Sequence, residues 1–225
     1  MSLKSLNVLV FEPKELFYNS VVVDLGTTGL NPANSQIFQI GAIKPTQKRI
    51  IVFNQYAYIE ENPAFSIKRI DPRDLKNCPP EREVLREFWD FAQDREFIVS
   101  YNAWFERKFL EKRSKKHQLA YEGHSYICLM ETFSYFFSTD RVPLPLAVRE
   151  CLGFSPLSWH DGKIGAYLAF RLFGFFCFLD HTVKIEPLCC FIDHNVQYKP
   201  LWAHTFFFIK AIRWKGKVPI SSNKL

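Results

Sequence analysis

The sequence predicts an α/β protein built on a mixed β-sheet with helices packed against it. Three segments with strand character, residues 21–24, 37–43 and 50–58, follow one another closely near the start of the chain. Helical and strand patterns alternate after them, beginning with a helix over 81–92 and a strand over 97–101. The closely spaced strands predict an antiparallel meander, and the later alternation predicts further strands joined by helices.

Composition predicts one large domain with an addition at each end. The chain has 225 residues, of which 48% are hydrophobic, which is enough for one substantial core. We expect an N-terminal extension over 1–16, the main domain over 17–179, and a tail over 180–225 that packs on or beside the domain. The tail is rich in aromatic and basic residues, so it is a candidate docking segment for a protein partner.

Cysteine usage and hydropathy predict a cytoplasmic protein that does not enter a membrane. The six cysteines include no Cys-x-x-Cys pair, and no cleavable signal sequence opens the chain, which favours a reducing compartment. The most apolar run, 166–179, contains Arg171 and is too short for a membrane span. The formal net charge of +6 is compatible with a polyanionic partner but is modest for this length.

The first strand carries the most informative residues. Its β-branched residues at 21–23 bring Asp24 to the end of a buried strand, and the Gly-Thr-Thr-Gly segment at 26–29 then turns the chain. A polar turn over 45–48 separates the second and third strands. A single carboxylate at a strand end is either hydrogen-bonded to loop amides or part of a metal site, and these residues alone leave both interpretations open.

The later elements place another carboxylate beside a strand. The strand over 97–101 ends at Asn102, and a helix over 103–112 holds Glu106 near its start. The basic run over 112–116 is either a solvated helix end or a contact for phosphate. The remaining expected elements are a strand over 126–130, a helix over 144–152 and a long helix from His160 to about 178.

Three short motifs occur in order along these elements. Residues 24–29 read Asp-Leu-Gly-Thr-Thr-Gly, residues 101–106 read Tyr-Asn-Ala-Trp-Phe-Glu, and His160 is followed five residues later by Gly165. They resemble the motifs of the DEDDh branch of the DnaQ-like 3′-to-5′ exonucleases, which read Asp-x-Glu-Thr-Thr-Gly, His-Asn-Ala-x-Phe-Asp, and a His with an Asp five residues later. The resemblance covers roughly residues 18–178.

The resemblance implies a ribonuclease H-like fold and a metal-dependent phosphodiester hydrolase. That family removes nucleotides from a 3′ end. It uses two divalent ions, Mg²⁺ or Mn²⁺, which four acidic residues hold, together with a catalytic histidine. By position, Asp24 corresponds to the ligand that bridges both ions, Glu106 to a ligand of the second ion, and His160 to the catalytic histidine. Gly26 and Gly165 stand where the family has the two acidic ligands of the ion that activates water.

Two glycines at ligand positions predict impaired catalysis. A pair of unit charges 4 Å apart is worth about 4 kcal/mol at an effective dielectric constant near 20, so losing two ligands should greatly weaken binding of the water-activating ion. Asp161 lies one helical turn before Gly165 and is a candidate substitute ligand. Fewer buried negative charges should still permit nucleic acid to bind. Candidate nucleic-acid contacts are Thr27, Thr28, Tyr101, Asn102 and Trp104.

Three functions remain open at this point. The leading interpretation is a nucleic-acid-binding protein of the exonuclease family that acts at single-stranded 3′ ends and is catalytically impaired, a pseudoenzyme. One alternative is an active metal-dependent 3′-to-5′ exonuclease that uses Asp24, Glu106, His160 and Asp161. The other is a non-catalytic scaffold for protein interactions, with the tail over 180–225 as the docking segment.

Overall fold

The computed structural model describes residues 12–59, 75–121, 123–156 and 161–178. Its elements in chain order are α1 (Pro13–Tyr18), β1 (Ser20–Thr27), β2 (Ile37–Pro45), β3 (Ile50–Tyr56), α2 (Glu81–Ala92), β4 (Phe97–Ser100), α3 (Ala103–Lys116), β5 (Ser125–Cys128), α4 (Leu129–Phe137), α5 (Leu144–Leu152) and α6 (Gly162–Cys177). None of the described helices is both long and apolar enough to cross a membrane. His160 and the tail over 180–225 lie outside the described residues.

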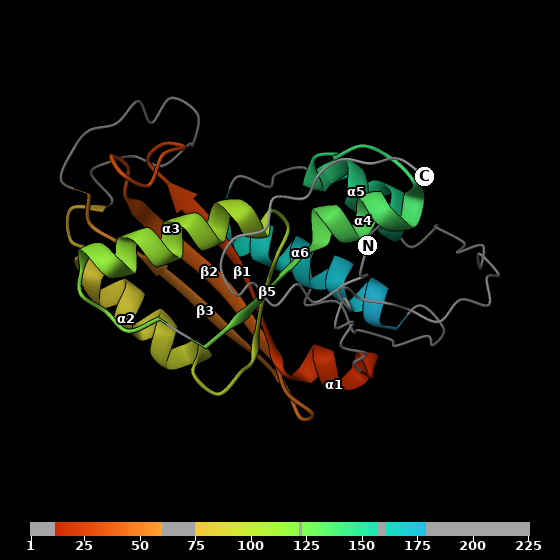
Figure 1. Cartoon of the computed structure of the whole chain (residues 1–225), viewed down its shortest axis with the longest axis horizontal. Coiled ribbons are helices and arrows are strands. Elements are labelled where there is room, and N and C mark those ends of the chain that lie inside the picture. The colour runs from red at the N-terminus through yellow and green to blue at the C-terminus, as the bar shows by residue number, and fades with distance from the viewer. Residues whose placement is uncertain (1–11, 60–74, 122, 157–160, 179–225) are drawn as a thin grey trace, which may run out of the picture.

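The described strands form one five-stranded mixed sheet in the order β3-β2-β1-β4-β5 (Figure 1). β1, β2 and β3 are antiparallel neighbours, which confirms the predicted meander. β4 pairs with β1 in parallel, and β5 pairs with β4 in parallel. The carboxyl ends of β1, β4 and β5 therefore lie at one edge of the sheet, where parallel strands usually bring functional residues together.

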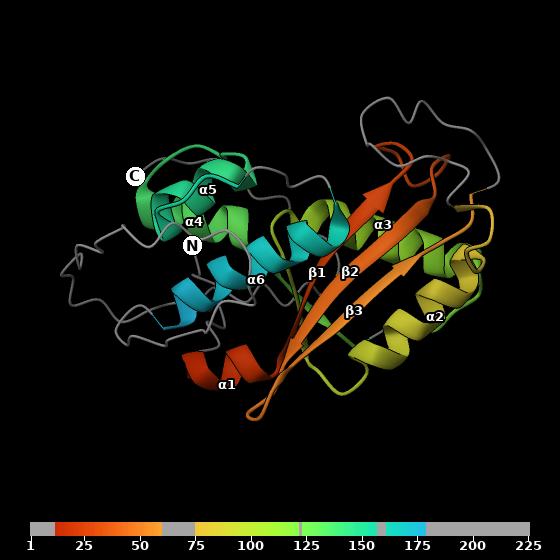
Figure 2. The same ribbon diagram turned by 180° about the vertical axis from the view of Figure 1, so that it is seen from behind.

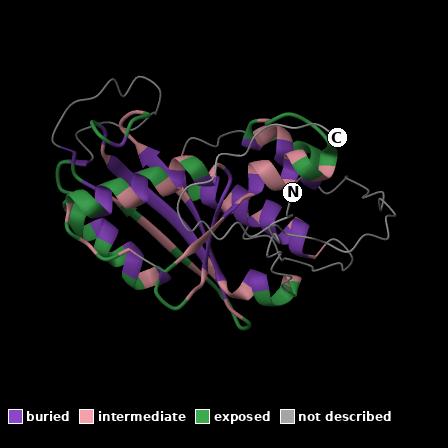
Figure 3. Cartoon of the chain, in the orientation of Figure 1, coloured by how far each residue is buried: buried purple, intermediate pink, exposed green. Residues whose placement is uncertain are grey.

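Helices cover both faces of the sheet, and the alternation of side chains along β1 shows which residues face which layer. Val21, Val23 and Leu25 pack with α2 and α3 in one apolar cluster. Val22 points the other way, into a second cluster with α1, α4, α5 and α6. Figures 1 and 2 show these two layers from opposite sides, and Figure 3 shows buried residues concentrated along the sheet between them.

Two helices were not predicted. α1 begins at Pro13, whose fixed φ suits the first turn of a helix, and it buries Leu16 and Phe17. α4 begins directly after β5, so the predicted strand over 126–130 ends at Cys128 and its last residues are helical. The short apolar run around this boundary fits either element by pattern alone. The burial of Leu129 and Phe133, one helical turn apart, shows the face on which α4 packs.

The predicted helix over 103–112 extends through the basic run to Lys116, and the run is not uniformly solvated. Arg113 is only 2% exposed and forms a buried ion pair with Glu81 at the start of α2. The Glu81 carboxylate also accepts a hydrogen bond from the backbone N–H of Ile37 at 2.8 Å and lies 2.9 Å from the Nε2 of His117. Arg113 therefore ties α3 to α2 and β2 and is not available for phosphate.

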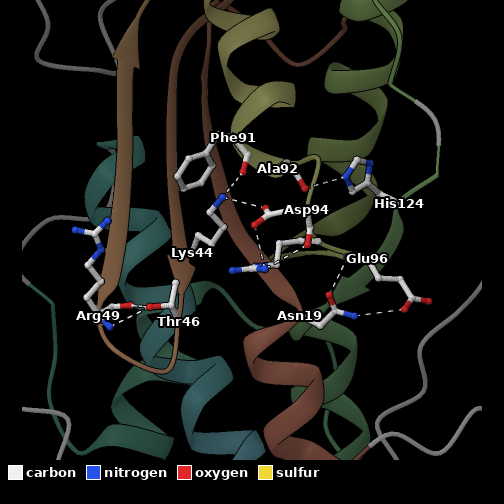
Figure 4. A network of polar contacts seen from close by, with 10 residues as sticks. Asn19, Lys44, Thr46, Arg49, Phe91, Ala92, Asp94, Glu96 and His124 are labelled. Carbon is white, nitrogen blue, oxygen red and sulfur yellow. Dashed lines mark hydrogen bonds and ion pairs between the residues drawn. The ribbon is translucent and has the colours of Figure 1, made fainter.

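At the end of the sheet where β1 and β4 begin, polar contacts fix the loop between α2 and β4 (Figure 4). The ammonium of Lys44 on β2 donates to the Phe91 carbonyl at 2.7 Å and to Asp94 at 3.0 Å. Asn19, just before β1, accepts from the backbone N–H of Glu96 at 3.3 Å and donates to its side chain at 3.4 Å. These contacts align β4 with β1, and thereby the residues that follow both strands.

The buried pair of Glu81 and Arg113 should contribute strongly to stability. We expect Arg113→Met to lower the free energy of unfolding by about 3–5 kcal/mol, because it leaves the Glu81 carboxylate buried without its cation. Urea denaturation measures this change. The matched control is Arg107→Met on the same helix, which breaks the partly exposed pair with Glu111 and should cost less than about 1 kcal/mol. Equal losses in the two variants would contradict the assignment.

Candidate active site

Asp24 lies near the end of β1 and faces the helix α6. It is half-buried, and it shares the sheet face of Val22, opposite to Val23 and Leu25. A Cβ atom built on Gly165 of α6 would lie 2.3 Å from the Asp24 Oδ2 and 2.6 Å from its Cγ. The Asp24 carboxylate therefore occupies the space that any side chain at position 165 would need.

Gly26 is the second position at which the resemblance implies a missing acid, and it too is enclosed. Its partner on β2 is Gln39, whereas Thr27 pairs with Ile37, so the register shift leaves Phe38 as an extra residue in a β-bulge. A Cβ atom built on Gly26 would lie 2.8 Å from two ring atoms of Phe38 and 2.9 Å from the Gln39 Cβ. The Phe38 ring is fully buried and packs with Ile59 and Leu75.

Glu106 approaches the same edge of the sheet from α3. It is 4% exposed, and its carboxylate accepts a hydrogen bond from the Ser100 hydroxyl at 3.3 Å, at the end of β4. Because Val22 of β1 is level with Val99 of β4, Asp24 lies level with the start of the turn into α3. The structure thus brings Asp24 and Glu106 to the ends of neighbouring parallel strands.

Asp161 is the N-cap of α6 and does not lie within the helix. Its Oδ1 accepts from the backbone N–H groups of Lys163 and Ile164 at 2.8 and 3.2 Å and from the Gln39 amide at 3.3 Å. Its Oδ2 accepts from the Tyr56 hydroxyl at 3.0 Å. Burial, and then the charge of Asp161, raise the pKa of Tyr56 to about 12. Both Asp161 oxygens are therefore engaged in fixing the start of α6 on β2 and β3.

The start of α6 also contacts the sheet through backbone atoms. A Cβ atom on Gly41 of β2 would lie 2.2 Å from the Gly162 carbonyl oxygen, so only glycine at position 41 permits this approach. The Gly162 N–H donates to the Gln39 side chain at 2.9 Å. These contacts set the distance between α6 and β1, and hence the contact between Gly165 and Asp24.

Thr27 ends β1, Thr28 begins the turn after it, and Asn102 lies in the turn before α3. The Thr27 hydroxyl donates to the Gly29 carbonyl at 2.8 Å, and the Thr28 hydroxyl accepts from the Gln36 N–H at 2.9 Å. Asn102 precedes α3, and its carbonyl accepts from the Glu106 N–H. All three are partly exposed, and both threonine hydroxyls brace the turn after β1.

The two aromatic residues of the second motif lie in different environments. Tyr101 is buried, its hydroxyl donates to the Val142 carbonyl at 2.5 Å, and burial raises its pKa above the usual range. Trp104 is 37% exposed, and its indole N–H donates to Glu131 of α4 at 3.0 Å. Of the two, only Trp104 presents a surface on which a base can stack.

The residues that enclose the site could not be predicted from the sequence. The bulge at Phe38 has no signature in a single sequence, and the contact between Trp104 and Glu131 requires the helix α4, which was read as a strand at its start. Within the described residues, no three His, Cys, Asp or Glu side chains are grouped so that they could hold a metal ion.

Comparisons with known proteins agree with this architecture. The exonuclease family RNase_T matches residues 21–147. The DNA polymerase III PolC-type of Thermotoga maritima is 38% identical over 160 residues, which are 67% of this chain and 12% of that protein. That of Caldanaerobacter subterraneus subsp. tengcongensis is 34% identical over 111 residues, 46% of this chain and 8% of that protein. The chain therefore spans only a small part of these relatives.

Solved structures confirm the predicted ribonuclease H-like fold of the DnaQ-like exonucleases. The nuclease domain of 3′hExo, a DEDDh family member bound to rAMP, superimposes with a TM-score of 0.57 at 17% identity, covering 69% of this chain and 90% of that one. E. coli Exonuclease I in complex with a 5cy-dT13 oligonucleotide superimposes with a TM-score of 0.57 at 15% identity, covering 70% and 42%. At such identities the likeness concerns the fold alone.

Two glycine substitutions test the packing of α6. Gly41→Ala should lower the free energy of unfolding by about 1–3 kcal/mol, because the new methyl group meets a backbone carbonyl that cannot turn away. Gly165→Ala should change it by less than about 1 kcal/mol, because alanine favours the helix by about 1 kcal/mol and offsets the rotation of the Asp24 carboxylate. Urea denaturation of both variants gives the comparison.

The decisive quantity is the difference between the losses in free energy of unfolding of these two variants. A loss for Gly165→Ala as large as that for Gly41→Ala would show that the Asp24 carboxylate is held rigidly against α6.

Proposed function

This chain belongs to the RNase_T exonuclease family, and from that premise we propose that it binds single-stranded 3′ ends of nucleic acid at Asp24 and Glu106 and cleaves them slowly or not at all. Because the chain matches only part of its curated relatives, the proposal concerns this domain and not the activity of a whole polymerase.

The observation that carries the proposal is that glycine stands at both ligand positions and that one of them is enclosed. At Gly26 the Phe38 ring and the Gln39 Cβ fill the space of an acidic side chain, whereas at Gly165 the nearest atoms belong to the Asp24 carboxylate, which can rotate. A missing ligand in an open cleft can be replaced by water, but position 26 is packed by protein atoms. The repacking favours a domain that is stable without its water-activating ion.

The residues present do not fit the two-ion centre that the family uses. Divalent magnesium requires several oxygen ligands in near-octahedral geometry, and two ions placed about 3.5–4 Å apart are normally held between shared carboxylates. Here the motif positions supply only Asp24 and Glu106. Asp161, the candidate substitute, already accepts four hydrogen bonds as the cap of α6, which argues against the rescued active site.

Catalysis without that ion would depend on His160, whose position lies outside the described residues. An imidazole acting as a general base contributes about 10²–10⁴ in rate, which is a small part of the 10⁶-fold or greater acceleration of typical enzymes. We therefore propose His160 as a proton acceptor only for whatever residual cleavage the protein retains.

Binding of nucleic acid is the part of the family function that the site can retain. Substituting glycine for two acids removes two negative charges from the cleft, so a phosphate meets less repulsion when no metal is present. In their solved complexes, 3′hExo holds rAMP and E. coli Exonuclease I holds an oligonucleotide on this same fold. We propose Thr27, Thr28, Asn102 and Trp104 as contacts, and we omit Tyr101 because it is buried.

We further infer a cytoplasmic protein. The cysteines at 78, 128, 151 and 177 form no disulfide within the described residues, as is usual in a reducing compartment. A protein partner bound by the tail over 180–225 stays a prediction, because those residues lie outside the described part of the chain.

Restoring the acids should restore cleavage only if space is made for them. We expect the unmodified chain to bind 5′-labelled single-stranded DNA or RNA without shortening it in Mg²⁺ or Mn²⁺. A variant with Gly26→Glu, Gly165→Asp and Phe38→Val should cleave at least about a hundredfold faster, because even residues that only support metal ligands change activity 10–100-fold. Gel electrophoresis measures cleavage, fluorescence anisotropy measures binding, and calorimetric titration with Mn²⁺ measures metal binding.

Phe38→Val alone is the matched control, since it opens the same space without adding a ligand and should leave cleavage unchanged. Cleavage by the unmodified chain within a few fold of the restored variant would overturn the proposal in favour of the active exonuclease. Failure of the unmodified chain to bind either strand would favour the protein-interaction scaffold.

A further inference from the structure

The outward face of α3 carries an exposed aromatic residue followed by lysines. At 100° per residue, Trp104, Lys108, Lys112 and Lys115 fall within one sector of about 80°. All four are exposed, whereas Glu106, Phe109, Leu110 and Arg113 of the same helix are buried. We refer to these four exposed residues as the α3 track. The first turn of α3 thus directs Glu106 toward the sheet and Trp104 toward solvent.

The charges of the track are not neutralised by neighbouring carboxylates. Both arginines of α3 have acidic partners, because Arg107 pairs with Glu111 and Arg113 pairs with Glu81. The track lysines form no such pair with any residue in the part of the chain that the structure describes. α3 therefore presents a net positive surface even though its sequence also contains glutamates.

Helix electrostatics explain only part of this pattern. Cations in the last turn are favoured by the helix dipole, which accounts for Lys115. Lys108 is in the middle of the helix, where that effect has fallen off, and Lys112 is a full turn farther along. A row of unpaired ammonium groups spaced by about one turn needs another partner, and a chain of phosphates has the complementary charge.

Trp104 is held in place at the head of this row. Its indole N–H donates to the Glu131 carboxylate of α4 at 3.0 Å, and the same oxygen accepts from Arg141 at 3.2 Å. A fixed ring loses less conformational entropy when a base stacks on it. Trp104 therefore combines exposure with a defined orientation, as a stacking residue requires.

We propose that the α3 track binds the single strand upstream of the 3′ end, with a base stacked on Trp104 and phosphates beside Lys108, Lys112 and Lys115. This inference rests on the proposed function, which places the 3′ end at Asp24 and Glu106. From Trp104 to Lys115 the helix rises about 16 Å, and a stacked strand rises about 3.4 Å per nucleotide. The track is therefore long enough for about five nucleotides.

The test compares oligonucleotides of 3 and 10 nucleotides with the full chain by fluorescence anisotropy, in EDTA so that no strand is cleaved. For the longer strand, the combined variant Lys108→Gln, Lys112→Gln and Lys115→Gln should reduce the slope of log affinity against log salt by about 2, since each phosphate contact of a single strand contributes about 0.7. The trinucleotide should bind the variant and the unmodified chain alike.

The matched control removes three cations from elsewhere on the surface. Lys14→Gln, Lys48→Gln and Arg49→Gln change exposed residues of α1 and of the turn between β2 and β3, and together they alter the net charge by the same amount. This control should leave the slope unchanged. Separately, Trp104→Ala should weaken binding of the longer strand at least about fivefold, and Trp104→Phe should retain most of the affinity.

The possible failures are distinguishable. If the unmodified chain binds both strands equally well, or if the track variant and the control have the same slope, the track is overturned while the proposed 3′-end site stands. If the unmodified chain binds neither strand, both the track and the proposed function are overturned.

Discussion

The close approach of α6 to the sheet is the constraint on which the site depends. The Gly162 carbonyl lies over Gly41, at a distance that excludes even a methyl group on β2. Gln39 and Tyr56 then fix the cap of the helix through Asp161. With the helix start fixed so closely, a glycine one turn later leaves room for the Asp24 carboxylate. The position of the helix thus decides what surrounds the first carboxylate of the family motif.

The carboxylates of this chain are divided between packing and the site. Glu81 and Asp161 each accept hydrogen bonds that join elements far apart in sequence, so their carboxylates stabilise the fold. Asp24 lies near the end of β1, and Glu106 is bonded to Ser100 at the end of the neighbouring parallel strand β4, where ligands meet in α/β proteins. An acidic residue close to a family motif, as Asp161 is, therefore does not by itself indicate a metal ligand, because its hydrogen-bond partners decide its role.

Sequence patterns predicted the meander and the helices of residues 81–92 and 103–112, because these depend on periodicity. They also placed Asp24 near the end of a strand and Glu106 in the first turn of a helix. They did not predict that Arg113 is buried, since its carboxylate partner lies on another helix. Nor did they predict the bulge at Phe38, which depends on the pairing register of two strands. Asp161 was expected one turn before Gly165 within a helix, but the helix begins after it and uses it as a cap.

The bulge that seats Phe38 over Gly26 also restricts how this domain can change over evolutionary time. A single replacement of Gly26 by an acid would drive the new side chain into a buried ring, so that step is costly unless residue 38 becomes smaller first. Reduction of residue 38 alone creates a cavity, which is also destabilising. Positions 26 and 38 are therefore epistatic, because either change made alone passes through a less stable protein.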